Sequence, residues 1–326
     1  MKILIANNCK IPVFAYGGTE RVIWDLGFHL TELGHDVTYL VAKGSKCDFA
    51  RVIEFDKKRN LISQIPSDFD IVHFQFNPKI DFDFPYIITE HSNHDLKFPM
   101  AKNTVFLTKN HAERHGSDQY VYNGLDWRNY GTVDFNTHRK NFHFLAKAAR
   151  PDKNIKGAID IALKSGNELD VLGGYRLNIN RHFRFTFSRF IHFHGMVGGK
   201  EKFKFLNNSR GLLFPVTWHE PFGLAVTESL YFGCPVFATS YGSLMELVPP
   251  ECGFLSNSCN ELAEAISDSN YHYDHKYCHE FALKNFGVEQ MTHGYLEKYS
   301  RIIDGEILNE KAPYLRGSRD NLPWNN

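Results

Sequence analysis

The sequence predicts an α/β protein built from two doubly wound domains, and three observations carry this prediction. The chain has 326 residues, a length typical of two domains. Short apolar runs alternate with helical patterns, which is the order expected of a parallel sheet covered by helices. The pattern stops at a polar, turn-rich stretch near residues 123–137 and then starts again. We therefore predict domains at residues 1–135 and 136–300, followed by a tail at 301–326 that could pack back on the first domain.

The first domain begins with a predicted βαβ unit. An apolar run at residues 3–6 is followed by a glycine-containing loop. Apolar residues then recur at helical spacing from Val22 to Leu33, and Gly34 follows, where a helix commonly ends. Residues 37–41 form the next predicted strand, which completes a unit with parallel strands. Further strands are predicted at 70–76, 86–91 and 104–108.

The second domain repeats this alternation of strands and helices. Helices are predicted at residues 155–165, at about 200–208 and at 223–232. Strands are predicted at 142–146, 169–174, 191–195, 211–215 and 235–239. The two domains therefore share one architecture, but a fold of this kind serves many functions and does not by itself identify one.

Composition and charge exclude several classes of protein. Hydrophobic residues make up 43% of the chain and aromatic residues 14%, which is too much for a disordered or fibrous protein. Lys plus Arg and Asp plus Glu each number 37, so the chain lacks the basic excess of a nucleic-acid-binding protein. The six cysteines show no CxxC spacing, which is typical of buried thiols in a reducing compartment.

We expect no membrane-spanning helix and no secretory signal in this sequence. No window approaches the roughly eighteen consecutive apolar residues that a spanning helix needs. The first eight residues run directly into a predicted strand, without the apolar stretch of a signal peptide. The expected location is cytoplasmic, with peripheral contact to a membrane left open.

The segment from His219 to Ser229 carries the strongest chemical signal. It contains Glu220, a Pro-Phe-Gly-Leu turn, and the start of a helix that holds a second acid, Glu228. A glycine at such a turn lets backbone approach a ligand closely, and a helix N-terminus offers unpaired N–H groups to a phosphate. The two carboxylates would then accept hydrogen bonds from sugar or ribose hydroxyls. Taken alone, this spacing is also that of an ordinary helix with solvated glutamates.

The block from His192 to Val248 closely resembles the donor-binding half of the family 4 retaining glycosyltransferases. The resemblance implies the GT-B fold, in which two Rossmann-like domains face a central cleft. It also identifies the two acids with the E-x7-E motif of the family, so that Glu220 lies by the transferred sugar and Glu228 binds the nucleotide ribose. The remaining implied contacts are the phosphates at Phe222, Gly223 and Leu224, and the base at Gly195, Met196 and Val197.

The first domain resembles the family more loosely. Gly17 and Gly18 resemble its glycine loop, and residues 121–126 resemble its Y-N-G segment. His91 ends a predicted strand at the edge that should face the cleft, where the family has a histidine near the transferred sugar. A packing role for His91 is equally open, and for His73, which resembles another histidine of the family, packing is favoured.

The family usually supplies two cations to the diphosphate, and their identity in this chain is open. Lys147 stands where the family has an arginine. The second cation is Lys153 by spacing, or Lys156, which keeps the following glycine, and Arg150 is a further candidate. Because a leaving diphosphate needs neutralising charge, we expect Lys147 and Lys153 to supply it. A solvated basic loop before a helix is the alternative.

Three other features are interpreted as structural. His272, His275, Cys278 and His279 have metal-binding side chains at near-helical spacing, but the resemblance implies a metal-independent enzyme, so we expect a polar helix face. Residues 176–190 interleave four arginines with four phenylalanines. They could form a membrane-surface or acceptor patch, but a hairpin with one buried face is preferred. Residues 81–83 (Asp-Phe-Asp) come near a DxD metal motif and are read as a loop.

These observations together predict a retaining, metal-independent hexosyltransferase that needs no cofactor. The expected donor is a nucleoside-diphosphate sugar, with UDP favoured, and the expected acceptor is a hydroxyl of a glycan or a lipid-linked molecule, in glycan, glycolipid or polysaccharide biosynthesis. No covalent nucleophile stands out, so the leaving phosphate is expected to deprotonate the acceptor in a front-face displacement. The alternatives are another GT-B enzyme, such as a sugar-nucleotide epimerase or a phosphorylase, and a non-catalytic sugar-nucleotide-binding protein.

Overall fold

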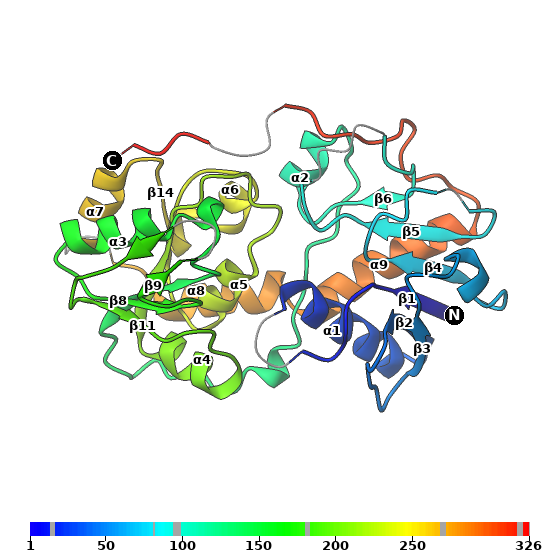
Figure 1. The fold of residues 1–326 in the computed structure, drawn as a ribbon, viewed down its shortest axis with the longest axis horizontal. Helices are drawn as coiled ribbons and strands as arrows, with labels where there is room; N and C mark the ends of the chain where they lie inside the picture. The colour runs from blue at the N-terminus through cyan, green and yellow to red at the C-terminus, as the bar shows by residue number, and fades with distance from the viewer. Residues whose placement is uncertain are drawn as a thin grey trace. The chain divides into compact units, whose positions relative to one another are not determined.

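The chain folds into two compact units (Figure 1). The computed structural model describes residues 1–13, 17–80, 82–93, 99–179, 183–267, 272–317 and 322–325. The first unit comprises Met1–Asp126 and Phe286–Ser318, and the second comprises Trp127–Asn285 and Arg319–Asn326. The chain therefore returns to the first unit at residue 286, whereas the sequence placed this boundary after residue 300. The return is early because helix α9 (Val288–Ile303) packs on α1 (Gly18–Glu32) of the first unit.

The first unit is built on a six-stranded parallel sheet in the order β3-β2-β1-β4-β5-β6. The strand order reverses between β1 and β4, which are neighbours in the sheet. Short helix α2 (Lys109–Arg114) and 3-10 helix η1 (Ile62–Gln64) complete the unit. The strands are β1 (Lys2–Ala6), β2 (Asp36–Ala42), β3 (Arg51–Phe55), β4 (Ile71–Phe74), β5 (Tyr86–Thr89) and β6 (Thr104–Val105).

Two glycines allow close packing in the first unit. A Cβ on Gly27 of α1 would lie 2.0 Å from the hydroxyl of Tyr39, which donates to the backbone carbonyl of Ile23. A Cβ on Gly124 would lie 2.1 Å from the carbonyl oxygen of Gly287, just before α9. The Y-N-G segment thus passes directly against the segment that brings the chain back into this unit.

The second unit has the same architecture, with a parallel sheet in the order β11-β8-β7-β12-β13-β14. The order reverses between β7 and β12. The strands are β7 (Asn141–Leu145), β8 (Leu169–Leu172), β11 (Ile191–Phe193), β12 (Ser209–Phe214), β13 (Val236–Ala238) and β14 (Gly253–Leu255). The helices are α3 (Ile155–Lys164), α4 (Gly199–Asn207), α5 (Leu224–Tyr231), α6 (Leu244–Leu247), α7 (Cys259–Ser267) and α8 (His275–Asn285), and the short 3-10 helices are η2 (Trp127–Asn129), η3 (Pro151–Lys153) and η4 (Pro250–Cys252).

A buried histidine joins three elements of the second unit. His143 of β7 is fully buried, and its two ring nitrogens bind the hydroxyls of Ser209 on β12 (2.6 Å) and Ser229 on α5 (2.8 Å). Burial lowers the pKa of His143 to about 3, so the ring is neutral at neutral pH. This link fixes α5 against the centre of the sheet.

The predicted strands and helices are all present, with ends that differ by a few residues. The connection between β8 and β11 is an antiparallel hairpin of β9 (Leu177–Asn178) and β10 (Arg184–Phe185), as the sequence indicated. One face of this hairpin is turned inward, with Thr186 only 8% exposed, but the apolar face is the exposed one. Phe183 is 77% exposed and Phe187 is 87% exposed.

The C-terminal residues contact both units in turn. The side-chain amide of Asn309 donates to the carbonyl oxygens of Lys102 (2.6 Å) and Thr104 (2.9 Å) in the first unit. The backbone of Asn325 pairs instead with Asn257 and Cys259 in the second unit. All six cysteines are free thiols, and four of them are buried. Among the helices of the described ranges, none combines the length and apolar character needed to cross a membrane.

Candidate active site

The carboxyl ends of β7 and β12 gather most of the predicted site residues of the second unit. In an open α/β sheet, ligands bind outside the carboxyl ends of the strands at the point where the strand order reverses, and here that point lies between β7 and β12. The loop after β7 carries Lys147, Arg150 and Lys153, and the loop after β12 carries Trp218 and Glu220. The sheet topology therefore brings the predicted cations and the first glutamate to one place.

Glu220 is held by two donors on one of its oxygens. Its Oε2 accepts hydrogen bonds from Lys153 Nζ at 2.5 Å and from the indole N–H of Trp218 at 2.9 Å. The side chain is only 7% exposed, so this carboxylate is not the solvated glutamate of an ordinary helix start. Gly242 makes this position possible, because its φ of 66° is left-handed and a Cβ there would lie 2.4 Å from the backbone N and O of Glu220.

The structure distinguishes the four candidate cations. Lys153 Nζ lies 4.7 Å from the ring centroid of Trp218 as well as against Glu220, and it is largely buried. Arg150 stacks on the same ring at 4.9 Å, but it is also paired with Asp152. Lys147 and Lys156 are exposed, and neither has a side-chain partner in the described part of the chain. Only Lys153 is therefore fixed beside the first glutamate.

Gly157 serves the start of α3 in this structure. The side chain of Asn154 accepts a hydrogen bond from the Gly157 backbone N–H at 3.0 Å and donates to the carbonyl of Pro215 at 2.9 Å. A Cβ on Gly157 would lie 2.4 Å from the Asn154 amide nitrogen. The Lys-Gly pair that the sequence offered as a cation marker is thus explained by the cap, which ties the β7 loop to the end of β12.

The turn at Pro221 to Leu224 delivers the N-terminus of α5. Gly223 precedes the helix with a left-handed φ of 96° and, as a glycine, offers no side chain to cap the first turn. The Phe222 side chain is buried in the unit, and its carbonyl accepts a 2.5 Å hydrogen bond from Ser243. Residues 222–224 can therefore meet a ligand through backbone rather than through the Phe222 side chain, as the resemblance implied.

Glu228 lies on α5 and is almost completely buried, with 2% exposed. Its Oε1 accepts hydrogen bonds from the Tyr130 hydroxyl at 2.8 Å and from Lys202 Nζ of α4. Lys202 is itself only 6% exposed, so the two form a buried ion pair. Each glutamate of the motif is thus paired with its own lysine.

The loop after β11 is fixed by backbone hydrogen bonds to the loop after β8. Gly195, with a left-handed φ of 71°, exchanges N–H···O bonds of 3.0 and 3.2 Å with Gly174. The next residue, Met196, is 38% exposed, and Val197 is half-buried. This loop lies at the same carboxyl edge of the sheet as the other site residues.

In the first unit, a chain of hydrogen bonds leads to His91 at the carboxyl ends of β4 and β5. His91 Nε2 lies 2.7 Å from Gln75 Oε1, and Gln75 Nε2 lies 2.9 Å from His73 Nε2. His73 is fully buried, and its Nδ1 lies 2.7 Å from the hydroxyl of Tyr299 on α9. His73 is therefore a core residue of this unit.

The tautomer of His91 follows from its partner. Burial lowers the pKa of His91 to about 4 and that of His73 to about 3, so both rings are neutral at neutral pH. Because Gln75 Oε1 can only accept, the hydrogen of His91 lies on Nε2, and Nδ1 is the accepting nitrogen.

In the glycine loop, a Cβ on Gly17 would lie 2.6 Å from Val13 Cγ2, so this position before α1 has no room for a side chain.

The prediction of a polar helix face for the histidine–cysteine cluster is wrong for three of its members. Cys278 is completely buried, while His275 and His279 bind the backbone carbonyls of Gly233 and Tyr231 at the end of α5. These side chains therefore dock α8 onto α5. No group of three or more His, Cys, Asp or Glu residues that could hold a metal occurs among the residues described above, and metal independence stays a prediction.

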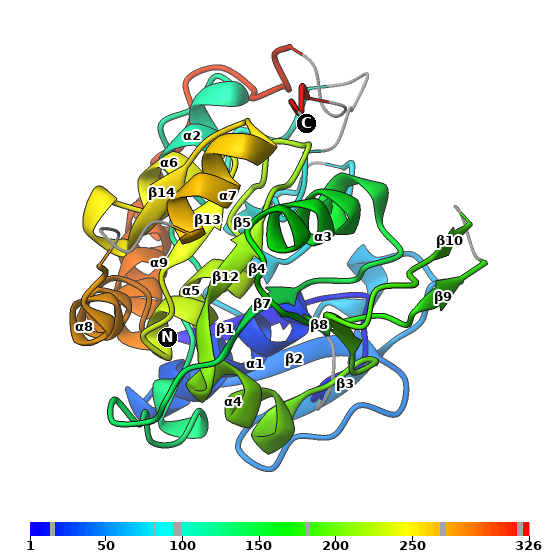
Figure 2. The same cartoon turned by 90° about the vertical axis from the view of Figure 1, so that its left-hand side faces the viewer.

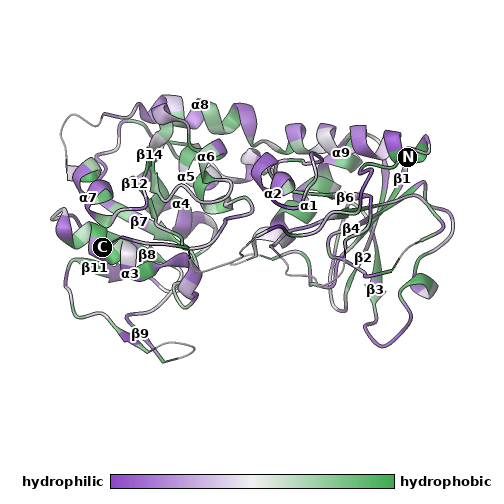
Figure 3. Cartoon of the chain, turned by 90° about the horizontal axis from the view of Figure 1, so that it is seen from above, coloured by the Kyte–Doolittle hydropathy of each residue, from purple (hydrophilic) through white to green (hydrophobic). Residues whose placement is uncertain are grey.

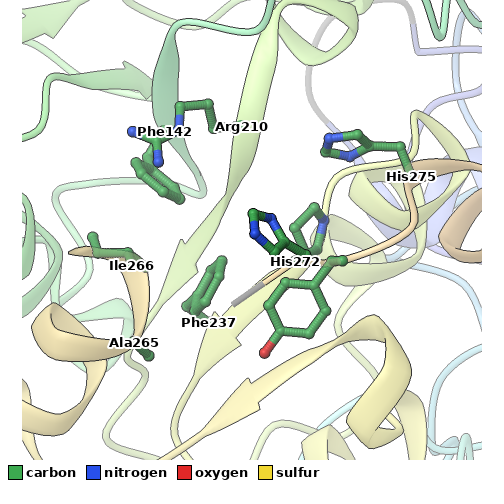
Figure 4. Close-up of a pocket in the computed structure, with 9 residues that line it drawn as sticks. Phe142, Arg210, Phe237, Ala265, Ile266, His272 and His275 are labelled. Carbon is green, nitrogen blue, oxygen red and sulfur yellow. The ribbon is translucent and has the colours of Figure 1, made fainter. Parts of the chain in front are cut away.

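A separate pocket of about 200 Å³ opens at the opposite, amino-terminal edge of this sheet (Figure 4). Its lining includes Phe142, Arg210, Phe237 and the two histidines His272 and His275. The Arg210 guanidinium lies 4.7 Å from the Phe142 ring centroid. The pocket is thus distinct from the loop that carries Glu220 and from Glu228 on α5.

Comparisons with known proteins match the second unit to a described family. The sequence model of the family described as "Glycosyl transferases group 1" matches residues 131–269, nearly the whole of the second unit. Residues 131–269 therefore resemble a glycosyl transferases group 1 domain. The strand-end loops with Lys153 and Glu220, the start of α5, and the Lys202–Glu228 pair all lie inside this domain.

Solved structures extend the likeness to both units and show that the fold is GT-B. AviGT4, a glycosyltransferase involved in avilamycin A biosynthesis, superposes with a TM-score of 0.76 at 19% identity, covering 94% of this chain and 98% of that one. Anabaena HepE, crystallised with UDP-glucose, gives a TM-score of 0.68 at 16% identity, covering 92% and 99%.

A curated relative matches a shorter segment. The "uncharacterized 41.2 kDa protein in cps region" of Klebsiella pneumoniae is 30% identical over 113 residues, which is 33% of this chain and 31% of that protein. The matched segment thus spans about a third of the relative. The family match and the fold support glycosyl transfer as the class of function of this chain.

Sequence reasoning missed Trp218, Lys202 and Tyr130, which contact the two glutamates of the second unit, and it missed Gln75, which contacts His91 in the first unit. One signal was available for Lys202, because it lies four residues before Leu206, on the face of α4 that is buried. A lone lysine among apolar positions of a helix indicates a buried partner. Nothing in the local pattern marks Gln75 or Tyr130, whose roles depend on contacts between distant segments.

Proposed function

We propose that this chain is a retaining glycosyltransferase that moves a hexose from a UDP-sugar to an acceptor hydroxyl. One observation carries the proposal: within the group 1 domain, Lys153 and Glu220 are fixed side by side at the point where the strand order reverses. A sugar diphosphate carries hydroxyls next to an anion, so it needs an acceptor and a cation at neighbouring positions. The UDP-glucose complex of Anabaena HepE, which shares the fold, supports UDP as the nucleotide.

Glu220 is suited to hold the transferred sugar. Lys153 and Trp218 both engage Oε2, and no partner for Oε1 is found among the residues that the structure describes. Oε1 can therefore accept hydrogen bonds from sugar hydroxyls. Because Lys153 and Trp218 fix the carboxylate before the donor arrives, little ordering is needed when the sugar binds.

The diphosphate would lie between the β7 loop and the start of α5. As the bond from the anomeric carbon to the diphosphate oxygen breaks, negative charge grows on the leaving phosphate. We propose that Lys147, Lys153 and the uncapped N-terminus of α5 stabilise this charge, with Arg150 and Lys156 as the remaining candidates. The leaving phosphate takes the proton of the acceptor hydroxyl as the new bond forms on the same face, so the anomeric configuration is retained. Because the protein's own cations balance the charge of the diphosphate, no metal is required.

The remaining contacts follow the E-x7-E motif. We propose that Glu228 binds the nucleotide ribose and that Lys202 balances its buried charge. The backbone of Gly195 to Val197 lies by the base. The first unit would bind the acceptor, with the glycine loop and His91 as its candidate contacts. A glycan or a lipid-linked acceptor is proposed, with His91 held in one tautomer by Gln75.

A two-step experiment tests this function. Sugar nucleotides are first screened for thermal stabilisation, because a ligand that binds the native state raises the unfolding midpoint. The donor that binds is then incubated with hydroxyl acceptors with and without EDTA, and products are analysed by mass spectrometry and NMR. Transfer with retention that persists in EDTA supports the proposal. Epimerised free sugar nucleotide would indicate an epimerase, and binding without turnover would indicate a non-catalytic protein.

A further inference from the structure

The hairpin of β9 and β10 exposes its apolar face and turns its polar face inward, the reverse of what is usual in a soluble protein. Residues directly opposite each other in an antiparallel pair lie on the same face, and here Leu177 pairs with Phe185 while Asn178 pairs with Arg184. With the two-residue period of a strand, the Leu177 side forms one apolar, outward surface. This aromatic face consists of Tyr175, Leu177, Ile179, Phe183, Phe185 and Phe187, which are between 41% and 87% exposed.

The opposite face of the hairpin is polar and holds its shape. Arg176 donates hydrogen bonds to the carbonyl oxygens of Thr186 (2.6 Å), Ser188 (2.9 Å) and Ile191 (2.7 Å). Arg184 donates to the Thr186 hydroxyl and to the Tyr175 carbonyl, and it stacks on Phe193 at 4.8 Å. These two arginines hold the strands together from the inner face, while the aromatic face stays largely exposed.

The hairpin also projects from its unit. Figure 2 and Figure 3 show β9 at the end of a limb that stands away from the six-stranded sheet of the second unit. Soluble proteins rarely expose a contiguous apolar patch larger than a few hundred Å², and larger ones mark sites of interaction. The aromatic face thus needs a partner that can accept a protruding apolar surface.

The charge of the surrounding segment indicates which partner. The hairpin segment at residues 175–190 contains four arginines and no Asp or Glu, and two of these arginines, Arg176 and Arg184, lie on its inner face. Arg189 is exposed and lies 5.1 Å from the ring of Phe190, at the base of the hairpin. A protein interface surrounds its apolar core with a polar rim, whereas the surface of an anionic bilayer attracts a segment whose charges are all positive.

We propose that the aromatic face docks the protein onto an anionic lipid bilayer, with its apolar side chains among the headgroups and acyl chains and Arg189 at the phosphates. Interfacial elements of this type combine an apolar face that enters the headgroup region with cations that bind anionic lipid. This proposal concerns a surface of the second unit and does not depend on which sugar or acceptor the site uses.

Vesicle co-sedimentation with the full chain tests the proposal. Vesicles of pure phosphatidylcholine are compared with vesicles of equimolar phosphatidylcholine and phosphatidylglycerol. The unmodified chain should bind the anionic vesicles more tightly, and raised salt should weaken this binding. The double variant Phe183→Ser/Phe187→Ser should reduce the partition coefficient between vesicles and buffer at least about tenfold, because each substitution removes an apolar ring that enters the bilayer. Arg189→Glu should reduce it at least about fivefold on anionic vesicles only.

A matched variant controls for general loss of apolar surface. Ile62→Ser/Ile307→Ser removes two exposed apolar side chains of the first unit, which are 47% and 60% exposed, and it should bind vesicles like the unmodified chain. Unchanged thermal midpoints in both double variants confirm that each is folded. The proposal is overturned if the phenylalanine variant still binds normally. It is also overturned if the unmodified chain does not bind vesicles but forms a dimer that the phenylalanine variant abolishes, because the aromatic face would then bind a second copy of the chain.

Discussion

At the scale of single residues, Glu220 is the most informative side chain to change. Its carboxylate is buried beside Lys153 and Trp218, so removing it affects both the sugar contact and the lysine. Glu220→Ala should lower kcat about a hundredfold, or roughly 3 kcal/mol, because interactions at the reacting sugar matter most in the transition state. The affinity for free nucleoside diphosphate should not fall, since Lys153 loses its competing carboxylate and stays available to phosphate.

Steady-state kinetics and calorimetry measure these two quantities. Glu251→Ala is the matched control, because Glu251 is an exposed glutamate of the same unit and its loss should leave both unchanged. A Glu220→Ala protein that is folded and keeps its normal kcat would place this residue outside the site. The assignment of the whole segment from His219 to Ser229 to the site would then be wrong as well.

Trp218 positions the Glu220 carboxylate, and this role can be separated experimentally from simple packing. Trp218→Phe keeps an aromatic ring near Lys153 and Arg150 but removes the N–H that donates to Glu220. A hydrogen bond to a charged group contributes about 1.5–3 kcal/mol, so kcat should fall about tenfold or more while KM for the donor changes little. An equal change in both constants, or a lowered thermal midpoint with normal kcat, would assign Trp218 to packing alone.

At the scale of elements, a buried ion pair joins α4 to α5. Lys202→Met would leave the Glu228 carboxylate buried without its cation, and breaking one side of such a pair typically costs about 3–5 kcal/mol. We expect a clear fall in the free energy of unfolding of the second unit, and denaturant titration measures it. Lys204→Met is the matched control, because Lys204 is exposed on the same helix.

The double variant Lys202→Met/Glu228→Gln separates pairing from packing. With both charges gone, stability should recover partly, and the difference from the sum of the single variants gives the coupling energy. If instead Lys202→Met is as stable as the unmodified protein, the ion pair seen in the structure contributes nothing. Donor affinity should fall in any variant without the Glu228 carboxylate, since the ribose contact is lost.

The elements also show how far sequence reasoning reaches. Local periodicity predicted helices such as α1 and α3, because an amphipathic stripe depends only on neighbouring residues. The strand β3 was not predicted, since Arg51–Phe55 is only partly buried and alternates weakly. The family resemblance pointed to Glu220, and the spacing already favoured Lys153 over Lys156. The structure adds that Lys153 lies against Glu220. Gly157 suggested Lys156, whereas its role is to make room for the Asn154 cap.

The hairpin between β8 and β11 shows a second limit of sequence reasoning. Alternation of apolar and polar residues predicted two strands with one buried face, because apolar side chains are usually inside. The alternation is present, but Arg176 and Arg184 occupy the inner face and make its hydrogen bonds. A pattern of period two fixes which residues share a face and leaves open which face is turned inward.

At the scale of the whole molecule, neutral histidines, of which His73 and His143 are fully buried, link stability to pH in both units. Burial lowers the pKa of His73 to about 3 and that of His91 to about 4 in the first unit, and that of His143 to about 3 in the second. In the unfolded chain each would titrate near its ordinary value of 6.5. Between the two pKa values, the unfolded state binds more protons than the folded state, so acid favours unfolding.

The free energy of unfolding should therefore be fully retained above about pH 6.5 and should fall as the pH is lowered toward 4. Each of these histidines can contribute up to about 1.4 kcal/mol per pH unit in this window. Thermal unfolding at about pH 7.5 and about pH 5.5 measures the effect. His143→Gln should reduce the pH dependence of the second unit, because the glutamine does not titrate, whereas His138→Gln should not, because His138 is exposed. An unfolding midpoint that stays constant from about pH 7.5 to about pH 5 would show that these rings do not remain neutral in the folded protein, and the tautomer assigned to His91 would then be wrong as well.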